Sequence, residues 1–217
     1  MSTPSTPVPQ VDHLVYATPE LEQGIREIES LLGVRASPGG QHPGRGTRNA
    51  LVALGPSSYL EIIGPDLEQQ PPAGDRWFGV DAIDGPTLVT WAAKTDDVER
   101  AHRDAAANGI ALGPVRTGSR RRFDGALLSW RLTEPASDMS DGVVPFFIDW
   151  GDSPHPASTA STASRGAALV ALVAEHPNDE SIRRTFRALG LDIPITHGSR
   201  PRLTAVIDCP RGRVELR

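Results

Sequence analysis

The sequence predicts an α+β fold in which a unit of one strand, one helix and further strands recurs along a chain of 217 residues. Three observations support this prediction. The order strand, helix, strands occupies residues 11–63, it returns in residues 87–150, and a shortened copy follows in residues 167–217. Because the apolar sheet face of one unit needs a neighbouring unit to cover it, we expect paired sheets that enclose a cleft.

The first unit starts with the apolar run 11–17, which we expect to be a strand. Thr18-Pro19-Glu20 then resembles a helix start with proline in the first turn. Apolar residues at a period near 3.6 continue from there to a glycine cap at Gly33. The glycine-rich stretch 38–47 is interpreted as a polar loop, and two strands are expected after it, at 49–54 and 59–63.

The second unit repeats this order. We expect a helix start at residues 95–97, a helix that ends before Gly109, and strands at 87–94, 110–115, 126–132 and 143–150. In the third unit, a helix over 179–189 is expected between strands at 167–174, 193–196, 203–207 and 213–216. The small-residue stretch between these units is interpreted as a linker. The expected division is therefore a flexible leader at 1–10, a paired core at 11–152, a linker at 153–166 and a third module at 167–217.

Composition excludes several classes of protein. The net charge of −5 argues against a nucleic-acid partner, and we interpret the arginine cluster 120–122 as a solvated loop or strand edge. No apolar run approaches the ~20 residues of a membrane span, so we expect no membrane partner and a cytoplasmic location. Cys209 is the single cysteine, which excludes an intramolecular disulfide and a multi-cysteine metal site.

Several motifs carry a resemblance to a known family. The runs VDHLVYATPELE, GGQHPGRGTRNALVALG and SYLEIIGPD fill residues 11–66, and VPFFIDWG, LVAEHP and GRVEL match more loosely in the later units. These motifs resemble glyoxalase-like domains of the vicinal-oxygen-chelate superfamily. The resemblance implies paired βαβββ modules whose mixed sheets curl around a cavity. It also implies an enzyme that uses a divalent metal to chelate vicinal oxygens of its substrate, although the superfamily includes non-catalytic binding proteins.

Three polar residues in apolar strands are candidates for the catalytic and metal site. Burial of an unpaired carboxylate at Glu61 would cost several kcal/mol, so we expect Glu61 to face a cavity, a metal or a cation. The alternatives are an outward-facing position at a sheet edge or an ion pair with Arg45 or Arg48. By resemblance, His13 takes the position of a metal ligand, and its alternative role is a hydrogen-bonded histidine within the sheet. Asp149 is expected to mirror Glu61 in the second unit.

A site of His13, Glu61 and Asp149 would suit one divalent Fe, Mn, Ni or Zn ion with open positions for substrate. Alignment of the two units places Thr90 opposite His13, and threonine is a poor ligand for these metals. The ligand set is therefore incomplete, and a site without metal stays open.

The candidate substrate-binding residues are of two kinds. The glycine-rich stretch, which is either a substrate loop or a plain connection, supplies polar groups, and tryptophans supply either pocket walls or core. These candidates are His42, Arg45, Arg48, Asn49, Trp91 and Trp150.

The leading hypothesis is an enzyme of the lyase, isomerase or dioxygenase type that acts on a small oxygenated metabolite, with Glu61 and His13 as catalytic residues. The alternative is a non-catalytic protein that sequesters a small molecule. In both cases the partner is a small-molecule ligand, and an exposed sheet edge in the third unit would favour a homodimer.

Overall fold

The structure is a computed structural model, and it describes residues 10–121, 125–135, 140–159 and 164–217. The leader up to residue 9, Arg122 of the arginine cluster and residues 160–163 of the expected linker lie outside these residues. The described chain has the predicted α+β fold, with strands that curl around an interior. In this part of the chain, no helix is both long and apolar enough to cross a membrane.

The first unit contains β1 (Val11–Ala17), α1 (Leu21–Leu32), β2 (Ser37–His42), β3 (Thr47–Ala53) and β4 (Tyr59–Pro65). Gly33 ends α1 as predicted, with a φ of 71° and its N–H donated to the carbonyl of Glu29. The expected start was wrong by two positions, because Glu20 and not Thr18 is the N-cap and Pro19 precedes the helix.

The interpretation of residues 38–47 as a loop was wrong, because β2 occupies residues 37–42 and pairs antiparallel with β3. Its glycines hid the strand in the sequence and are required by the structure. A Cβ at Gly39 would lie 1.9 Å from Oδ1 of Asn49, so only glycine allows the two strands to approach this closely. His42 is therefore the last residue of a strand, and only residues 43–46 form the turn.

The second unit contains β5 (Thr87–Lys94), α2 (Val98–Ala107), β6 (Val115–Arg121), β7 (Leu127–Thr133) and β8 (Phe146–Asp149), with short 3-10 turns η1 (Trp77–Gly79) and η2 (Ser140–Gly142) before β5 and β8. Asp97 caps α2 by accepting the N–H of Arg100, as the sequence predicts. The strand expected at 110–115 was wrong, since the strand starts where that range ends. Arg120 consequently lies in β6 and is buried, not solvated.

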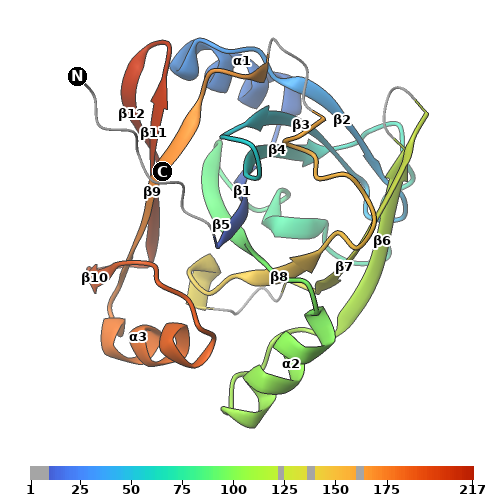
Figure 1. The fold of residues 1–217 in the computed structure, drawn as a ribbon. Helices are drawn as coiled ribbons and strands as arrows, with labels where there is room; N and C mark the ends of the chain where they lie inside the picture. The colour runs from blue at the N-terminus through green and yellow to red at the C-terminus, as the bar shows by residue number, and fades with distance from the viewer. Residues whose placement is uncertain (1–9, 122–124, 136–139, 160–163) are drawn as a thin grey trace.

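The first two units share one eight-stranded sheet, in the order β2-β3-β4-β1-β5-β8-β7-β6. Its centre is the antiparallel pair β1 and β5, and each of these strands is parallel to the last strand of its own unit. The sheet curls into an open ring of strands (Figure 1). The two edge strands β2 and β6 meet where a guanidinium nitrogen of Arg120 donates to the carbonyl of Gly39 at 2.9 Å, so the ring is nearly closed.

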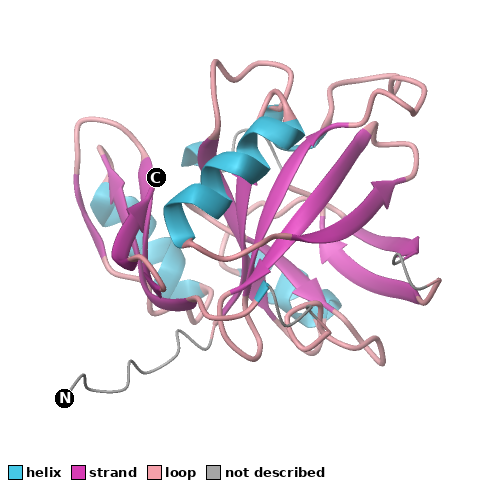
Figure 2. Cartoon of the chain, turned by 90° about the horizontal axis from the view of Figure 1, so that it is seen from above, coloured by secondary structure: helices cyan, strands magenta, loops and turns pink. Residues whose placement is uncertain are grey.

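The third unit contains β9 (Ala168–His176), α3 (Asp179–Ala188), β10 (Ile195–His197), β11 (Arg202–Cys209) and β12 (Gly212–Leu216). It repeats the order of elements, but its strands form a separate sheet in the order β10-β9-β11-β12. In this sheet β9 is parallel to β10 and does not pair with the last strand, β12. Figure 2 shows this sheet beside the curled eight-stranded sheet, called the barrel below, with α1 near both. Trp91 of β5 and Phe186 of α3 meet edge to face in the apolar core between them.

Candidate active site

Asp12 and His13, two neighbouring residues of β1, form a buried hydrogen-bonded pair. Nδ1 of His13 lies 2.8 Å from Oδ1 of Asp12, and both side chains are almost completely buried. Adjacent side chains of a regular strand point to opposite faces, but the pairing of β1 with β5 shifts register between Val11 and His13. This irregularity explains how consecutive residues can contact each other. Because a carboxylate only accepts hydrogen bonds, Nδ1 of His13 carries a proton.

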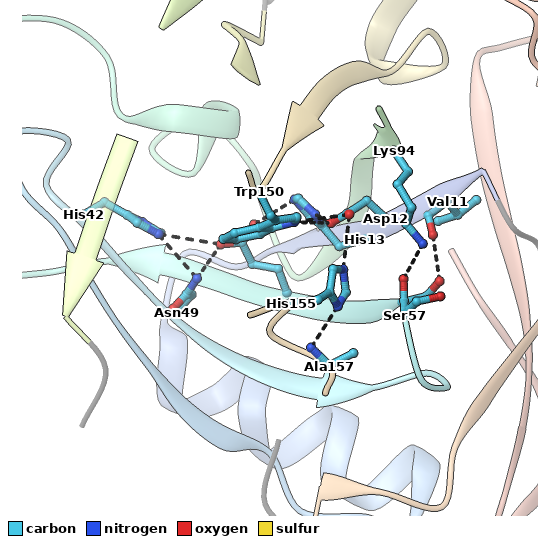
Figure 3. Close-up of polar contacts among 12 residues, drawn as sticks. Val11, Asp12, His13, His42, Asn49, Ser57, Lys94, Trp150, His155 and Ala157 are labelled. Carbon is cyan, nitrogen blue, oxygen red and sulfur yellow. Dashed lines mark hydrogen bonds and ion pairs between the residues drawn. The ribbon is translucent and has the colours of Figure 1, made fainter. Parts of the chain in front are cut away.

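Two groups from the chain after β8 hold the Asp12 carboxylate (Figure 3). Nε1 of Trp150 donates to both Asp12 oxygens at 3.2 Å, and Nε2 of His155 lies 3.2 Å from Oδ2. The N–H of Ala157 donates to Nδ1 of His155, which assigns the His155 proton to Nε2. Burial acts to raise the pKa of Asp12, but the hydrogen bonds from His13 and His155 outweigh it, so the pKa lies well below its ordinary value.

Glu61 of β4 faces the same interior, which supports the expectation that this carboxylate faces a cavity. Its Oε1 accepts the side-chain N–H of Asn49 at 2.5 Å, and its Oε2 lies 3.7 Å from Nε2 of His13. Glu61 forms no ion pair with the two predicted alternatives. Arg45 pairs with Glu134 and Arg48 pairs with Glu22, both outside this interior.

His42, at the end of β2, completes the polar cluster. Nδ1 of its ring lies 3.0 Å from Oγ1 of Thr47, and Nε2 lies 3.8 Å from Oε1 of Glu61. Burial lowers the pKa of His42, and the charge of Glu61 opposes this effect while that of Arg120 adds to it. His42 is therefore a neutral imidazole at neutral pH.

Aromatic rings form the walls of the cavity around this cluster. The ring of Tyr59 is stacked on His13 at 4.6 Å, and Phe146 meets His13 edge-on at 5.4 Å. Burial raises the pKa of Tyr59 well above its ordinary value of 10.0, so the phenol stays protonated. The cavity has a volume of about 30 Å³. Its other lining residues include Trp77, Phe78, Arg120, Trp130 and Trp150.

Two larger clefts adjoin this inner cavity. A lateral cleft of about 850 Å³ shares Asn49 and Arg120 with it, at the seam between β2 and β6. A hydrogen bond from Arg120 to the carbonyl of Gly39 spans that seam, and the N–H of Gly40 donates to Asn49 of the neighbouring strand β3. An outer cleft of about 610 Å³ lies at the mouth of the barrel, where Trp77 and Phe78 separate it from the inner cavity.

Asp149 is not brought together with His13 and Glu61. Its carboxylate accepts the guanidinium of Arg131 and the N–H of Gly151, both at 2.8 Å. The paired registers explain the misplacement, since Val15 faces Glu61 in the first unit and the equivalent Ala92 faces Phe146 in the second. Phe146 is thus the counterpart of Glu61. Asp149 lies three residues further along, on the opposite face of β8.

The register supports the alignment of Thr90 with His13. His13 pairs with Ala92 while Val15 pairs with Thr90, as expected for two strands related by a local twofold axis. Of the four equivalent positions, His13 and Glu61 carry metal-ligand side chains, whereas Thr90 and Phe146 do not. Among the described residues, no cluster of three or more His, Cys, Asp or Glu side chains has the geometry to hold a metal ion. The residues therefore do not fit the predicted three-ligand metal site.

Three further candidates lie outside the inner cavity. Trp91 is completely buried on the other face of β5, where its indole N–H donates to the carbonyl of Val143. Arg48 is directed toward Glu22 of α1, and Arg45 lies over the ring of Trp77 at 4.4 Å. Of the predicted substrate-binding residues, the structure brings together His42, Asn49 and Trp150.

Sequence reasoning missed several residues of this cluster. Asp12 carries the same signal as Glu61, an acid within an apolar run, and could have been found from it. His155 gives no such signal, because it stands in a small-residue stretch and reaches Asp12 only through the fold. Arg120 was hidden in a run of arginines typical of a solvated surface.

Comparison with known proteins places these observations in a wider context. A family model described as a glyoxalase-like domain matches residues 11–190. No curated protein matches the chain. Solved structures with a similar fold include a hypothetical protein from Staphylococcus aureus, with 14% identity over 94% of this chain and 83% of that chain and a TM-score of 0.63.

Two other solved structures have lower TM-scores and slightly higher sequence identities. One is a Streptomyces coelicolor methylmalonyl-CoA epimerase in complex with 2-nitronate-propionyl-CoA, with 21% identity, 65% of this chain and 97% of that chain covered, and a TM-score of 0.47. The other is a methylmalonyl-CoA epimerase in complex with methylmalonyl-CoA and NH4+, with 22% identity, coverage of 69% and 99%, and a TM-score of 0.47. At these identities the likeness concerns the fold alone.

Proposed function

The chain belongs to the glyoxalase-like domain family of the vicinal-oxygen-chelate superfamily, and we propose that it is an isomerase or lyase that moves a proton on a small oxygenated substrate. The observation that carries this proposal is the buried pair of Asp12 and His13. Asp12 accepts a hydrogen bond from the Nδ1–H of His13, so Nε2 of His13 is available as a base at the wall of the inner cavity.

The reaction that suits this arrangement starts at a carbon next to a carbonyl group. Nε2 of His13 takes the proton from that carbon, and the electron pair of the broken C–H bond moves toward the carbonyl oxygen. Return of the proton to the other face or to a neighbouring atom completes an isomerisation, whereas loss of a leaving group completes an elimination. The imidazolium formed on His13 is stabilised by the carboxylates of Asp12 and Glu61 on its two sides.

Other groups of the cavity suit the charge that develops on the substrate oxygen. The neutral ring of His42 can hydrogen-bond to an oxygen without bringing its own charge, and the buried guanidinium of Arg120 lies in the same wall. The aromatic walls exclude water and strengthen both interactions. These features support acid-base chemistry on an oxygen-bearing substrate.

The test is hydrogen exchange at carbon in deuterated water, followed by proton NMR. The protein is incubated with a panel of 2-oxo acids, 3-oxo acids, hydroxyaldehydes and acyl thioesters. We expect loss of the proton next to the carbonyl of at least one compound, and a His13→Gln variant should slow this loss by about 10²-fold or more. His176→Gln is the matched control, because His176 is also buried but lies in β9 of the other sheet, where its Nδ1 accepts the N–H of Asn178.

A His13→Gln variant as active as the wild-type protein would show that His13 is not the base. Binding of a panel compound without exchange would favour the second candidate function, sequestration of a small molecule. The observation behind that candidate is the aromatic wall made by Tyr59, Trp130, Phe146 and Trp150, which suits retention of a ligand as well as its conversion.

A further inference from the structure

The inner cavity is too small for any substrate in its present form. A volume of about 30 Å³ has room for about one or two water molecules. The outer cleft is about twenty times larger, and both spaces are lined by Trp77, Phe78, Pro135 and Phe146. Because a hydrogen bond from the buried Arg120 to the carbonyl of Gly39 spans the lateral seam, we take the wall at the mouth of the barrel as the part that a substrate displaces.

Trp77 in this wall carries a polar atom without a partner. Its Nε1 is buried and has no hydrogen-bond acceptor among the described residues. The N–H of Trp91 donates to Val143 and that of Trp150 donates to Asp12, so both of these indoles are satisfied. A buried donor without an acceptor destabilises the folded state, and phenylalanine would fill the same place without that cost.

The backbone next to Trp77 is also unfavourable. Phe78 has a φ of 60°, a left-handed conformation that a residue with a Cβ rarely adopts. Contacts on both sides hold the segment in place. Arg76 donates to the carbonyl of Gly46 at 2.8 Å and to Asp81 at 2.7 Å.

Arg45 holds Trp77 itself. Its guanidinium lies 4.4 Å from the centre of the Trp77 ring, and its other contact is an ion pair of 2.6 Å with Glu134 at the end of β7. Trp77 is thus kept at the boundary of the two spaces by residues from both units of the barrel. Such fixed but strained segments cluster where ligands bind.

We propose that the indole N–H of Trp77 donates a hydrogen bond to an oxygen of the substrate, which reaches His13 past the Trp77–Phe78 wall. This inference rests on the site proposed above and adds a requirement to its substrate. The substrate class is a small carbonyl or carboxylate compound with one acceptor oxygen near the mouth and its reacting carbon near His13.

The test uses the indole N–H signals of ¹⁵N-labelled protein, with acetone as a small probe that only accepts hydrogen bonds. A Trp77→Phe variant assigns the Trp77 signal. We expect acetone to move this signal downfield and to leave the Trp91 signal in place. Trp77→Phe should weaken acetone binding by about tenfold, the equivalent of ~1.4 kcal/mol.

Thermal unfolding of two matched variants separates a binding role from a structural one. Trp77→Phe removes a donor without an acceptor, so its Tm should equal or exceed that of the wild-type protein. Trp91→Phe leaves the carbonyl of Val143 unpaired, so its Tm should fall by roughly 2–8 °C while acetone binding stays unchanged.

A Trp77 signal that acetone does not move would overturn the inference, and so would a Tm loss in Trp77→Phe as large as that in Trp91→Phe. The exchange experiment on His13 gives an independent result. Carbon exchange with a silent Trp77 signal leaves the proposed reaction intact and refutes the role of Trp77. A moved Trp77 signal without exchange supports that role in binding and contradicts the reaction.

Discussion

Asp12→Asn is the most informative single substitution, because the structure assigns Asp12 both an energetic and a catalytic effect. The carboxylate accepts hydrogen bonds from His13, Trp150 and His155 and is completely buried. Asparagine has the same size but offers one acceptor oxygen, and its NH₂ group must face one of these donors. A hydrogen bond to a charged group contributes about 1.5–3 kcal/mol, and a buried donor left without an acceptor costs about 1–3 kcal/mol. We expect a loss of about 3 kcal/mol, because several such bonds are weakened while one acceptor oxygen remains.

The pH dependence of this loss provides an internal check. The pKa of Asp12 is lowered in the folded state, whereas the unfolded carboxyl has its ordinary value of about 3.9. The stability that Asp12 contributes is therefore fully present above the unfolded value and is lost as the pH falls toward the folded value. The difference in unfolding free energy between wild type and Asp12→Asn should be constant from about pH 5 to 7 and should shrink below about pH 4.

Urea unfolding at several pH values measures this difference, and exposed Asp152→Asn, in the turn between Trp150 and His155, is the control with no expected change. In deuterated water, Asp12→Asn should also slow carbon exchange by about 10²- to 10⁴-fold, because the amide no longer requires the proton on Nδ1 of His13. A stability loss below about 0.5 kcal/mol, or a difference that does not change down to pH 3, would refute the assigned role of Asp12.

Three further outcomes are expected. Gly39→Ala should destabilise the protein by about 2 kcal/mol or more in urea unfolding, since its Cβ would meet Asn49, while Gly74→Ala, with nothing within 4 Å, should change stability by less than about 0.5 kcal/mol. Asp149→Asn should lower the free energy of unfolding by about 1 kcal/mol and leave carbon exchange unchanged. A strong loss of exchange in this variant would show that Asp149 takes part in the reaction. His42 should titrate by NMR below 6.5, and because the unfolded ring binds protons first, wild-type stability should fall as the pH drops below about 6.5, an effect that His42→Gln should remove.

Much of the fold could be predicted because its signals are local. The ends of α1 and α2 depend on Gly33 and Asp97, whose capping geometry involves residues within one turn. The strand β2 could not be predicted this way, because Gly39 and Gly40 are typical of a loop and become a strand only by pairing with β3. The start of β6 was likewise decided by its partner β7.

The residues of the candidate site also differ in whether the sequence alone could identify them. A polar residue in an apolar strand must face something polar, and this rule identified Glu61 from sequence, whereas the family resemblance pointed to His13. It also selected Asp149, because the rule cannot tell which face of a strand a residue occupies until the register is known. In the folded chain, Phe146 takes the position that matches Glu61.

The sequence by itself indicated the repeated units, the family and four polar residues that line the cavity, His13, His42, Asn49 and Glu61, because these follow from the order of side chains along the chain. Only the tertiary structure showed that Asp12 pairs with His13 and that His155, 143 positions after Asp12 in the chain, contacts the same carboxylate. It also showed that the N–H of Trp77 is buried without an acceptor among the described residues. These features depend on strand register and on contacts between distant segments, and such contacts form only when the whole sheet has closed.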